Sequence, residues 1–388
     1  MDAPDSLIAT ISPSDAARGE WDAIVIGAGP TGSVAGAGLA RSGMRTLIVD
    51  RTVHPREKVC GGCLSSAGTR ALARLGLSRA VNDAMPLRTL RLHAGGRSAS
   101  VSIEGYVAIG RRTLDARLAA LALEAGARLL WPASARLLPG GDVQITSPSG
   151  DFRTAAAAVI VADGLSGTSL RDDPASAWIV RPQSRIGAGA ILDSSPLPLR
   201  EDEVAMLCHR EGYLGLVRLP CGRVNAAAAF DPRAARNAGG PARLAARLIE
   251  RAGGDAQAID RARWKGTPAL TRRRARIEAR CMLVAGDAAR YVEPFTGEGM
   301  TWAIESGESV VPHALSMARR EYRTGQWTRA STRLLRRRHL TCAAVAGVLR
   351  SPLALEMIVT LGAARPSLAS MLGRWIGLSS PQQVGASA

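Results

Sequence analysis

A turn with three glycines, set between an apolar run and a helix-like stretch, constrains the fold of this chain more than any other feature. Residues 23–26 are apolar and rich in β-branched side chains, which predicts a buried strand. The turn Gly27-Ala28-Gly29-Pro30-Thr31-Gly32 follows at once, and a helix is expected over residues 31–41. In such a unit the first glycine permits the tight turn, the second lets the backbone approach a pyrophosphate, and the third lets the helix pack on the strand. The helix N-terminus then favours the phosphates.

The acid that follows the second strand agrees with this interpretation. Residues 45–49 predict that strand, which ends at Asp50 and is followed by Arg51. Asp50 lies about 20 residues beyond the glycines, where a carboxylate accepts hydrogen bonds from the ribose hydroxyls of a dinucleotide. We therefore assign the glycine turn, including Pro30 and Thr31, together with Asp50 and Arg51, to a dinucleotide site.

Two later motifs favour a flavin as the second half of that dinucleotide. Asp163-Gly164 follows an apolar strand predicted over residues 156–161, and Gly286-Asp287 follows another over residues 282–285. Asp287 is placed to hold hydroxyls of a ribityl chain. The stretch from Pro294 to Met300 comes next, and its Gly297-Glu298-Gly299 would offer backbone N–H groups at a helix start to the flavin N1–C2=O edge, where negative charge gathers on reduction.

In this order the motifs resemble those of the FAD-dependent superfamily with the glutathione-reductase type of fold. The similarity is closest to the class A flavoprotein monooxygenases and to the geranylgeranyl-reductase-like branch. Residues 55–62 resemble the Pro-Arg…Lys-x-Cys-Gly-Gly segment of that branch, and residues 212–225 resemble its pair of substrate strands. Residues 111–115 resemble the family's Arg-x-x-x-Asp, which implies that Arg111 lies on the FAD. The branch tends to carry aromatic residues where this chain has Val217 and Leu219.

The resemblance implies an α/β fold, with a Rossmann-like FAD-binding domain, an inserted mixed β-sheet substrate domain and C-terminal helices. We expect residues 20–75, 105–165 and 275–315 to form the FAD domain. Residues 76–104 and 166–274 are expected to form the substrate-binding sheet, and residues 316–388 a helical region. Because no second GxGxxG follows a later strand, NAD(P)H is expected to visit the flavin only transiently.

The leading functional hypothesis is hydroxylation of an electron-rich aromatic substrate with NAD(P)H and O₂, through an oxygen adduct at C4a of the flavin (a C4a-hydroperoxide). Pro294, Gly297 and Gly299 would lie against the reacting face through their backbone, and Tyr213 and His209 are further pocket candidates. One alternative keeps the fold and reduces an alkene, as in the reductase-like branch. Another is hydroxylation of an aromatic side chain on a peptide or protein, as a maturation step.

Composition narrows the partners and the compartment. The formal net charge is +17, which can attract an acidic substrate, NADPH, an acidic protein or a membrane surface, while aromatic residues make up only 4% and nucleic-acid motifs are lacking. We expect no signal peptide at residues 1–20 and no transmembrane segment, hence a cytoplasmic protein. The substrate is expected to be aromatic or lipid-like. Residues 334–371 could cap the domain or contact a membrane or partner peripherally.

The cysteines indicate neither a disulfide framework nor a metal site. Six cysteines in a chain of 388 residues that is expected to be cytoplasmic do not form a disulfide framework. Cys60-Gly61-Gly62-Cys63 has the spacing of half a zinc site, but no second such pair exists, so no metal is expected. We interpret this segment as a glycine-rich loop beside the flavin, although a redox pair stays open.

Overall fold

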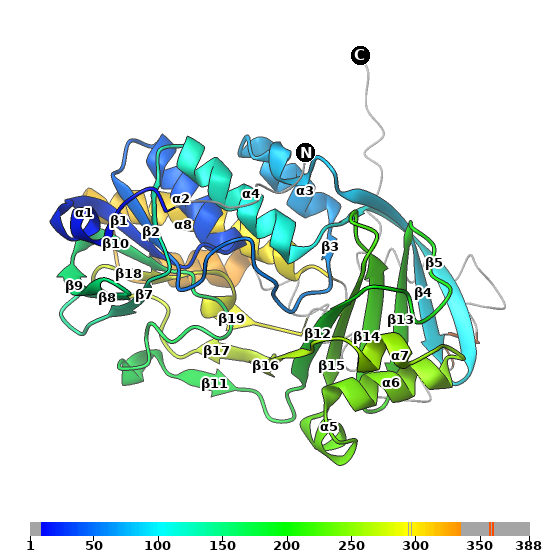
Figure 1. The fold of residues 1–388 in the computed structure, drawn as a ribbon. Helices are drawn as coiled ribbons and strands as arrows, with labels where there is room; N and C mark the ends of the chain where they lie inside the picture. The colour runs from blue at the N-terminus through cyan, green and yellow to red at the C-terminus, as the bar shows by residue number, and fades with distance from the viewer. Residues whose placement is uncertain (1–8, 294, 296, 335–356, 358, 361–388) are drawn as a thin grey trace.

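A parallel five-stranded sheet forms the first layer of the molecule (Figure 1). The computed structural model describes residues 9–293, 295, 297–334, 357 and 359–360. The sheet has the order β18-β10-β1-β2-β6. Its strands are β1 (Trp21–Ile26), β2 (Thr46–Val49), β6 (Arg128–Leu130), β10 (Ala156–Val161) and β18 (Met282–Val284). The chain leaves β1 toward β2 on one side, and β10 adds on the other, so a ligand crevice is expected where β1 and β10 end.

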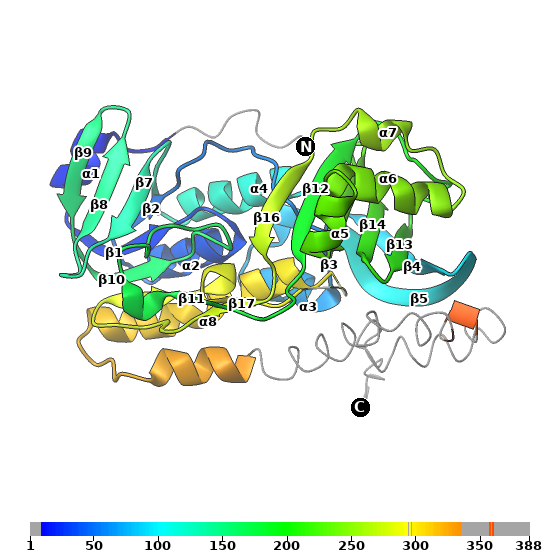
Figure 2. The same cartoon turned by 90° about the horizontal axis from the view of Figure 1, so that it is seen from below.

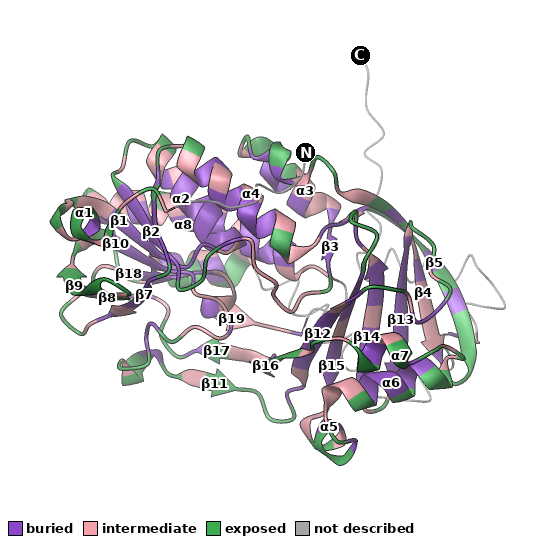
Figure 3. Cartoon of the chain, in the orientation of Figure 1, coloured by how far each residue is buried: buried purple, intermediate pink, exposed green. Residues whose placement is uncertain are grey.

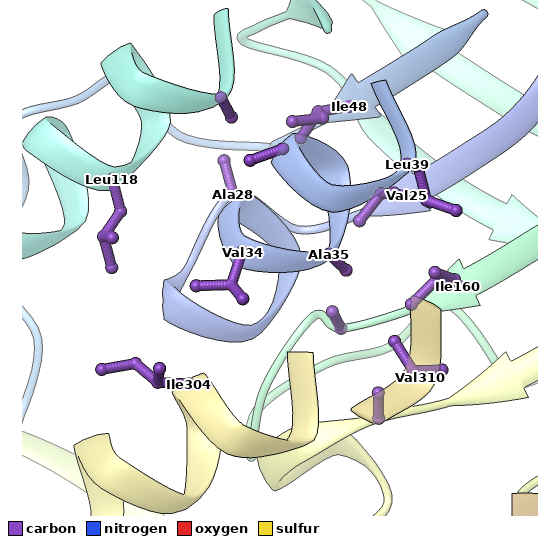
Figure 4. Packing of buried hydrophobic residues seen from close by; sticks show 14 of the residues in the cluster. Val25, Ala28, Val34, Ala35, Leu39, Ile48, Leu118, Ile160, Ile304 and Val310 are labelled. Atoms are coloured by element: carbon purple, nitrogen blue, oxygen red, sulfur yellow. The ribbon is translucent and has the colours of Figure 1, made fainter. Parts of the chain in front are cut away.

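Helices cover one face of this sheet. They are α2 (Pro30–Arg41), α4 (Arg111–Glu124) and α8 (Gly299–Ala318). Figure 4 shows Val34 of α2 and Ile304 of α8 in the apolar core between these layers. Glycines let α2 approach closely, since a Cβ at Gly36 would lie 2.5 Å from Ile48 Cδ1. The tight packing fixes the start of α2 at the end of β1.

Smaller elements cover the other face. An antiparallel sheet of β7 (Ser134–Leu137), β8 (Val143–Ser147) and β9 (Gly150–Thr154) packs there through one apolar cluster, and α1 (Pro13–Arg18) lies beside β9. Because both faces are covered, the strands of the parallel sheet are apolar along most of their length, as is typical of such sheets.

A second, eight-stranded sheet stands apart from the first (Figures 1 and 2). Its order is β16-β12-β15-β14-β13-β4-β5-β3, and it is mixed because β13 pairs with β4 in parallel. The strands are β3 (Cys63–Leu64), β4 (Met85–Ala94), β5 (Arg97–Ala108), β12 (Ile186–Leu192), β13 (Glu203–His209), β14 (Gly212–Arg218), β15 (Val224–Phe230) and β16 (Lys265–Ala269). One face packs on α5 (Pro232–Asn237), α6 (Pro241–Arg251) and α7 (Gln257–Asp260). The other face has its own apolar cluster and borders the cavity described below.

Short elements complete the described fold. β11 (Trp178–Val180), β17 (Arg272–Arg274) and β19 (Arg290–Tyr291) form a third sheet, which lies near β16 in Figure 1. Helix α3 (Ser66–Arg74) contacts α8. The 3₁₀ turns are η1 (Ser78–Val81), η2 (Pro174–Ser176) and η3 (Gly286–Ala288). Buried residues concentrate in the middle of the sheets and under the helices (Figure 3).

This architecture confirms the predicted fold class. One detail differs from the domain limits, because β3 joins the eight-stranded sheet although residues 20–75 were assigned to the FAD domain. Of the predicted C-terminal helical region, residues 326–334 are helical. Most of residues 334–371, with the predicted capping or membrane-contacting surface, lies outside the described residues. Within the described chain, no helix has the length and apolar character needed to cross a membrane.

Candidate active site

Three adjoining cavities form one channel between the parallel sheet and the eight-stranded sheet. The first, of about 80 Å³, is lined by Gly27, Gly29, Asp50 and Arg51. The second, also about 80 Å³, extends from Gly29 to Gly297. The third, of about 220 Å³, runs from Gly297 to the eight-stranded sheet. Adjoining cavities share lining residues, so a long ligand can pass from one to the next.

The glycine turn forms a cradle at the start of this channel. A Cβ at Gly27 would lie 2.5 Å from the carbonyl oxygen of Ala162, so the end of β1 fits against the end of β10 only without a side chain. Gly29 caps α2 with no side chain bonded to the first helical N–H groups. The nearest groups to a Cβ at Gly29 would be Arg111 Nη2 at 3.8 Å and Arg56 Nη2 at 3.9 Å. Free N–H groups facing two guanidinium groups suit a pyrophosphate.

Two predicted residues of the turn act through packing. Gly32 has to be a glycine, since its Cβ would lie 1.8 Å from the Gly27 carbonyl oxygen. The Thr31 hydroxyl donates to the carbonyl of Ala303 on α8 at 2.9 Å, which ties α2 to α8. Thr31 and Pro30 line the second cavity. The Thr31 side chain is therefore engaged within the protein, while its backbone remains at the cradle.

Asp50 lies in the first cavity as an ionised acceptor. Its Oδ2 accepts a bond from the Ala28 N–H at 2.7 Å, and its Oδ1 accepts from the Thr52 N–H at 2.9 Å. Burial by itself would raise the pKa of Asp50, but Arg56 and these N–H groups outweigh it and hold the pKa below its ordinary value. A carboxylate held in this way at the end of β2 suits ribose hydroxyls. Arg51 also lines this cavity.

A chain of buried ion pairs supports the wall of the channel. Arg111 donates to both oxygens of the fully buried Asp115, at 2.7 and 2.8 Å. Arg56 lies 3.4 Å from the same carboxylate through Nη1 and 3.5 Å from Asp50 Oδ2 through Nη2. The predicted Arg-x-x-x-Asp motif is thus one bidentate pair, and it holds Arg111 where it lines the second and third cavities.

Lys58 lines all three cavities. Within the described part of the chain, no group bonds to its ammonium nitrogen, which lies 3.0 Å from where a Cβ on Gly164 would be. Burial, with repulsion from Arg111 and Arg56, lowers its pKa to about 8. Lys58 was not among the predicted site residues. Its only signal was its place in the segment of residues 55–62 that resembles the reductase-like branch.

The two acidic motifs lie at different depths of the channel. Asp163 Oδ2 accepts bonds from the Ser169 N–H at 3.0 Å and from its hydroxyl at 2.6 Å, and Asp163 borders the first cavity. Asp287 borders the second and third cavities. Burial raises the pKa of Asp287 to about 6 although Arg111 and Lys58 oppose the shift. Gly286 has a positive φ of 60°, and a Cβ there would meet Thr31 Oγ1 at 2.2 Å.

The predicted flavin-face loop reaches the channel next to the start of α8. Gly297, with a φ of 73°, lines the second and third cavities, and Gly299 and Met300 line the second. Glu298 is the N-terminal cap residue of α8. Pro294, which was also predicted at this face, lies outside the described residues. The described part of the loop thus places a helix N-terminus beside the cavity.

The far end of the third cavity is apolar. It is formed by the inner face of the eight-stranded sheet and by Phe295, whose ring stands edge-on to Tyr213 with centroids 5.0 Å apart. The apolar lining residues there include Leu90, Ile103, Leu165, Val204, Met206 and Leu270. Tyr213 is buried, and within the described chain no hydrogen bond occupies its hydroxyl. Burial raises the pKa of Tyr213 well above its ordinary value, so it stays protonated.

His209 does not reach this cavity. It lines a separate groove with His93, Arg97 and Arg251, where Arg251 Nη1 lies 2.9 Å from its Nε2. Glu211 Oε2 lies 3.1 Å from its Nδ1. The geometry thus gives no support to the predicted catalytic role of His209, whereas it places Tyr213 in the cavity wall.

The residues that line the channel fit the successive parts of FAD. The cradle requires glycines, two guanidinium groups face it, and Lys58 adds a cation. Asp50 lies at one end of the track, and Asp287 with the start of α8 lies at the other. This order of acceptors and cations matches a ribose, a pyrophosphate, a ribityl chain and a ring.

Comparison with known proteins agrees with this geometry. The model of the family described as FAD binding domain matches residues 20–311. The menaquinone reductase of Mycobacterium tuberculosis (strain ATCC 25618 / H37Rv) is 37% identical over 120 residues, which are 29% of this chain and 29% of that protein. The chain therefore matches less than a third of this relative's length.

Two solved structures are similar in fold. A geranylgeranyl bacteriochlorophyll reductase-like protein from Thermoplasma acidophilum gives a TM-score of 0.73 at 20% identity, over 89% of this chain and 92% of that one. The p-nitrophenol 4-monooxygenase of Pseudomonas putida DLL-E4 gives 0.72 at 15% identity, over 92% of this chain and 98% of that one. With the family match over residues 20–311, the chain belongs to the FAD-binding-domain family.

Proposed function

We propose that this protein is a monooxygenase that uses NAD(P)H and O₂ to hydroxylate an electron-rich aromatic substrate with a largely apolar body. The observation that carries this proposal is the continuity of the third cavity from Gly297 to the apolar face of the eight-stranded sheet. Bound FAD would supply the electron transfer and the activation of oxygen. The chain's own contribution is an enclosed space that excludes water and holds the ring of the substrate near the flavin.

Different residues of the third cavity would contact different parts of the substrate. Leu90, Ile103 and Met206 contribute apolar contacts for the body of the substrate. The Tyr213 hydroxyl is protonated and unoccupied within the described chain, so it can donate to one substrate oxygen and orient the ring. Charged groups, among them Lys58 and Asp287, lie at the flavin end of the cavity.

Reduction of an alkene is the second candidate, and Cys60 favours it. Cys60 lines both the second and the third cavity, as Gly297 does. Burial raises the pKa of its thiol, so the thiol keeps a proton that it can donate to a carbon. In this alternative the substrate takes a hydride from the reduced cofactor and a proton from Cys60. The likeness over 120 residues to a protein named menaquinone reductase also favours a reduction. A peptide-borne aromatic substrate and a cytoplasmic location stay predictions from the sequence.

Turnover with and without O₂ distinguishes the two reactions. Purified protein with FAD and NAD(P)H is mixed with phenols, quinols and prenylated rings, and products are identified by mass spectrometry. Oxygen transfer predicts a product that carries one atom from ¹⁸O₂ and no product under argon. Alkene reduction predicts a product with two added hydrogen atoms that also forms under argon, and this result would overturn the leading proposal.

Two variants serve as matched controls. Cys60→Ser replaces the thiol by a weaker acid, so it should slow alkene reduction strongly and leave oxygen transfer within about threefold of the parent rate. Tyr213→Phe removes one hydrogen bond to a substrate oxygen, which should raise KM with a smaller change in kcat if the bond serves binding. Retention of the visible flavin spectrum in both variants shows that FAD binding is intact.

A further inference from the structure

A buried ion pair joins the eight-stranded sheet to the flavin-face loop. Arg185 directly precedes β12, and Glu293 lies in the segment between β19 and α8 that leads to Gly297. Arg185 Nη1 lies 2.9 Å from Glu293 Oε1, and the two side chains are only 4% and 3% exposed. The pair therefore joins the start of β12 in the eight-stranded sheet to the segment that leads to Gly297.

Aromatic contacts extend this connection into the cavity wall. The Arg185 guanidinium carbon lies 5.6 Å from the centroid of the Tyr213 ring. Tyr213 in turn meets Phe295, which follows Glu293 by two residues, at an interplanar angle of 88°. Arg185, Glu293, Tyr213 and Phe295 thus form one unit, here called the loop clamp, and its two aromatic members line the third cavity.

Stability alone is a weak explanation for the ion pair of the loop clamp. Removing two charges from water costs free energy that their attraction often fails to recover, and apolar side chains of similar volume frequently do as well. Arg185 Nη2 is also buried without a hydrogen-bond partner in the described chain, which adds a cost. The charged pair differs from an apolar contact in being directional. A short bond between a guanidinium and a carboxylate fixes the relative position of the two chain segments that carry these groups.

We propose that Arg185 and Glu293 are positioning residues, which hold the loop of Gly297 at the place where it meets both the FAD and the substrate wall. The backbone N–H groups at Gly297 and at the start of α8 can stabilise the flavin only if the loop keeps its position at the channel. The ion pair fixes the position of the loop relative to the eight-stranded sheet. The Tyr213–Phe295 contact fixes the same loop at the surface of the third cavity. This inference requires FAD binding and is independent of which reaction the enzyme catalyses.

A second ion pair in the same sheet provides a matched control. Arg91 Nη2 lies 2.6 Å from Glu203 Oε2, and the Glu203 side chain is fully buried. This pair joins β4 to β13, which are neighbouring strands of one sheet. Neither residue lines the channel. Its loss should therefore lower stability without reaching the flavin.

The test compares single and double variants as holoenzymes. FAD release is followed through the recovery of FAD fluorescence on serial dilution, the visible spectrum reports the flavin environment, and thermal unfolding reports stability. We expect Arg185→Met and Glu293→Gln to raise the Kd for FAD about tenfold, as for the loss of a coupled supporting contact, and to shift the flavin bands. Arg185→Lys should restore part of both properties, and Arg91→Met should lower Tm while leaving both unchanged.

The double variant Arg185→Met/Glu293→Met keeps the proposal falsifiable if a single change unfolds the protein. It removes both charges, so the fold should recover, but the FAD Kd and the flavin spectrum should remain altered. If this variant and Glu293→Gln bind FAD within about twofold of the parent, with an unchanged spectrum, the pair is only structural and the proposal fails.

Discussion

Replacing Lys58 by methionine should weaken FAD binding without disturbing the fold. Lys58 lines the whole channel, and none of the described residues bonds to its ammonium group. A charge-assisted hydrogen bond contributes about 1.5–3 kcal/mol, so losing one between Lys58 and an FAD phosphate or carbonyl oxygen should raise the Kd for FAD about 10- to 150-fold. Methionine keeps most of the apolar stem, and it removes a buried charge, so Tm of the FAD-free protein should not fall.

The pH dependence gives this prediction a second, independent readout. The pKa of Lys58 is lowered to about 8, so the ammonium form predominates below that pH. Bound FAD carries negative phosphates and favours the ammonium form. FAD affinity should therefore be highest below pH 8 and fall as the pH rises through 8, by at most tenfold per pH unit. Lys58→Met should abolish this fall.

Fluorescence titration of FAD release between pH 6.5 and 9.5 measures both effects. The control is Lys265→Met, because Lys58 and Lys265 are the two lysines of the chain. Lys265 lines the third cavity but neither of the two cavities nearer the glycine turn, and it is exposed and donates to the Glu57 carbonyl at 3.1 Å. Lys265→Met should keep the affinity and the pH dependence of the parent. The reasoning is refuted if Lys58→Met binds FAD as tightly as the parent, or if its affinity still falls through pH 8.

Three further substitutions test other contacts of the channel. Asp115→Asn should lower the free energy of unfolding by about 3–5 kcal/mol, because it leaves Arg111 and Arg56 buried without their shared carboxylate. Denaturant unfolding measures this loss, and a value below about 1 kcal/mol contradicts the prediction. The pKa of Asp115 lies below its ordinary value, since Arg111 and Arg56 outweigh burial; its stabilisation is thus present above the ordinary pKa of Asp and should disappear as the pH falls through the lowered one. Gly32→Ala should yield protein without bound flavin, because the Cβ would meet the Gly27 carbonyl at 1.8 Å, whereas Gly140→Ala, where a Cβ meets open space, should purify with the parent's flavin content. Met206→Trp should fill the apolar end of the cavity and raise KM at least about tenfold with unchanged FAD affinity; unchanged KM would place the substrate elsewhere.

The site features that can be predicted from the sequence are local ones. The glycine turn, Asp50 and the Gly286-Asp287 motif each depend on a strand, a turn and the next few residues. Short-range constraints of this kind can be read from periodicity and glycine placement alone. The order of the five parallel strands depends instead on contacts between distant segments, for which the chain carries no short-range signal.

Lys58 and Arg56 were missed because they lie on an irregular segment. Residues 50–62 have neither a helical nor a strand period, so nothing in the sequence says which of their side chains point into the channel. Their convergence with Arg111 depends on how α4 packs beside α2. The unequal ionic environments of Asp50 and Asp287 likewise arise only from tertiary burial.

Tyr213 lines the third cavity and His209 does not, because side chains alternate between the two faces of a strand. On β13, Met206 and Cys208 face the cavity side, while Ala205 and Leu207 pack toward the helices. His209 continues the second set, and it meets Arg251 at the end of α6. One residue of offset decides which face a side chain reaches, so this assignment required the register of β13.

The two walls of the channel come from distant parts of the sequence, and this determines when the FAD site can form during synthesis of the chain. Gly27 and Gly297 line the same track, although they lie 270 positions apart in the sequence. At about 5–20 residues per second, the ribosome needs about 14–54 s to make that stretch. Throughout this interval the nascent chain presents a phosphate-binding turn whose opposite wall has not yet been made. Capture of FAD by the complete channel is therefore a late event in the synthesis of the chain.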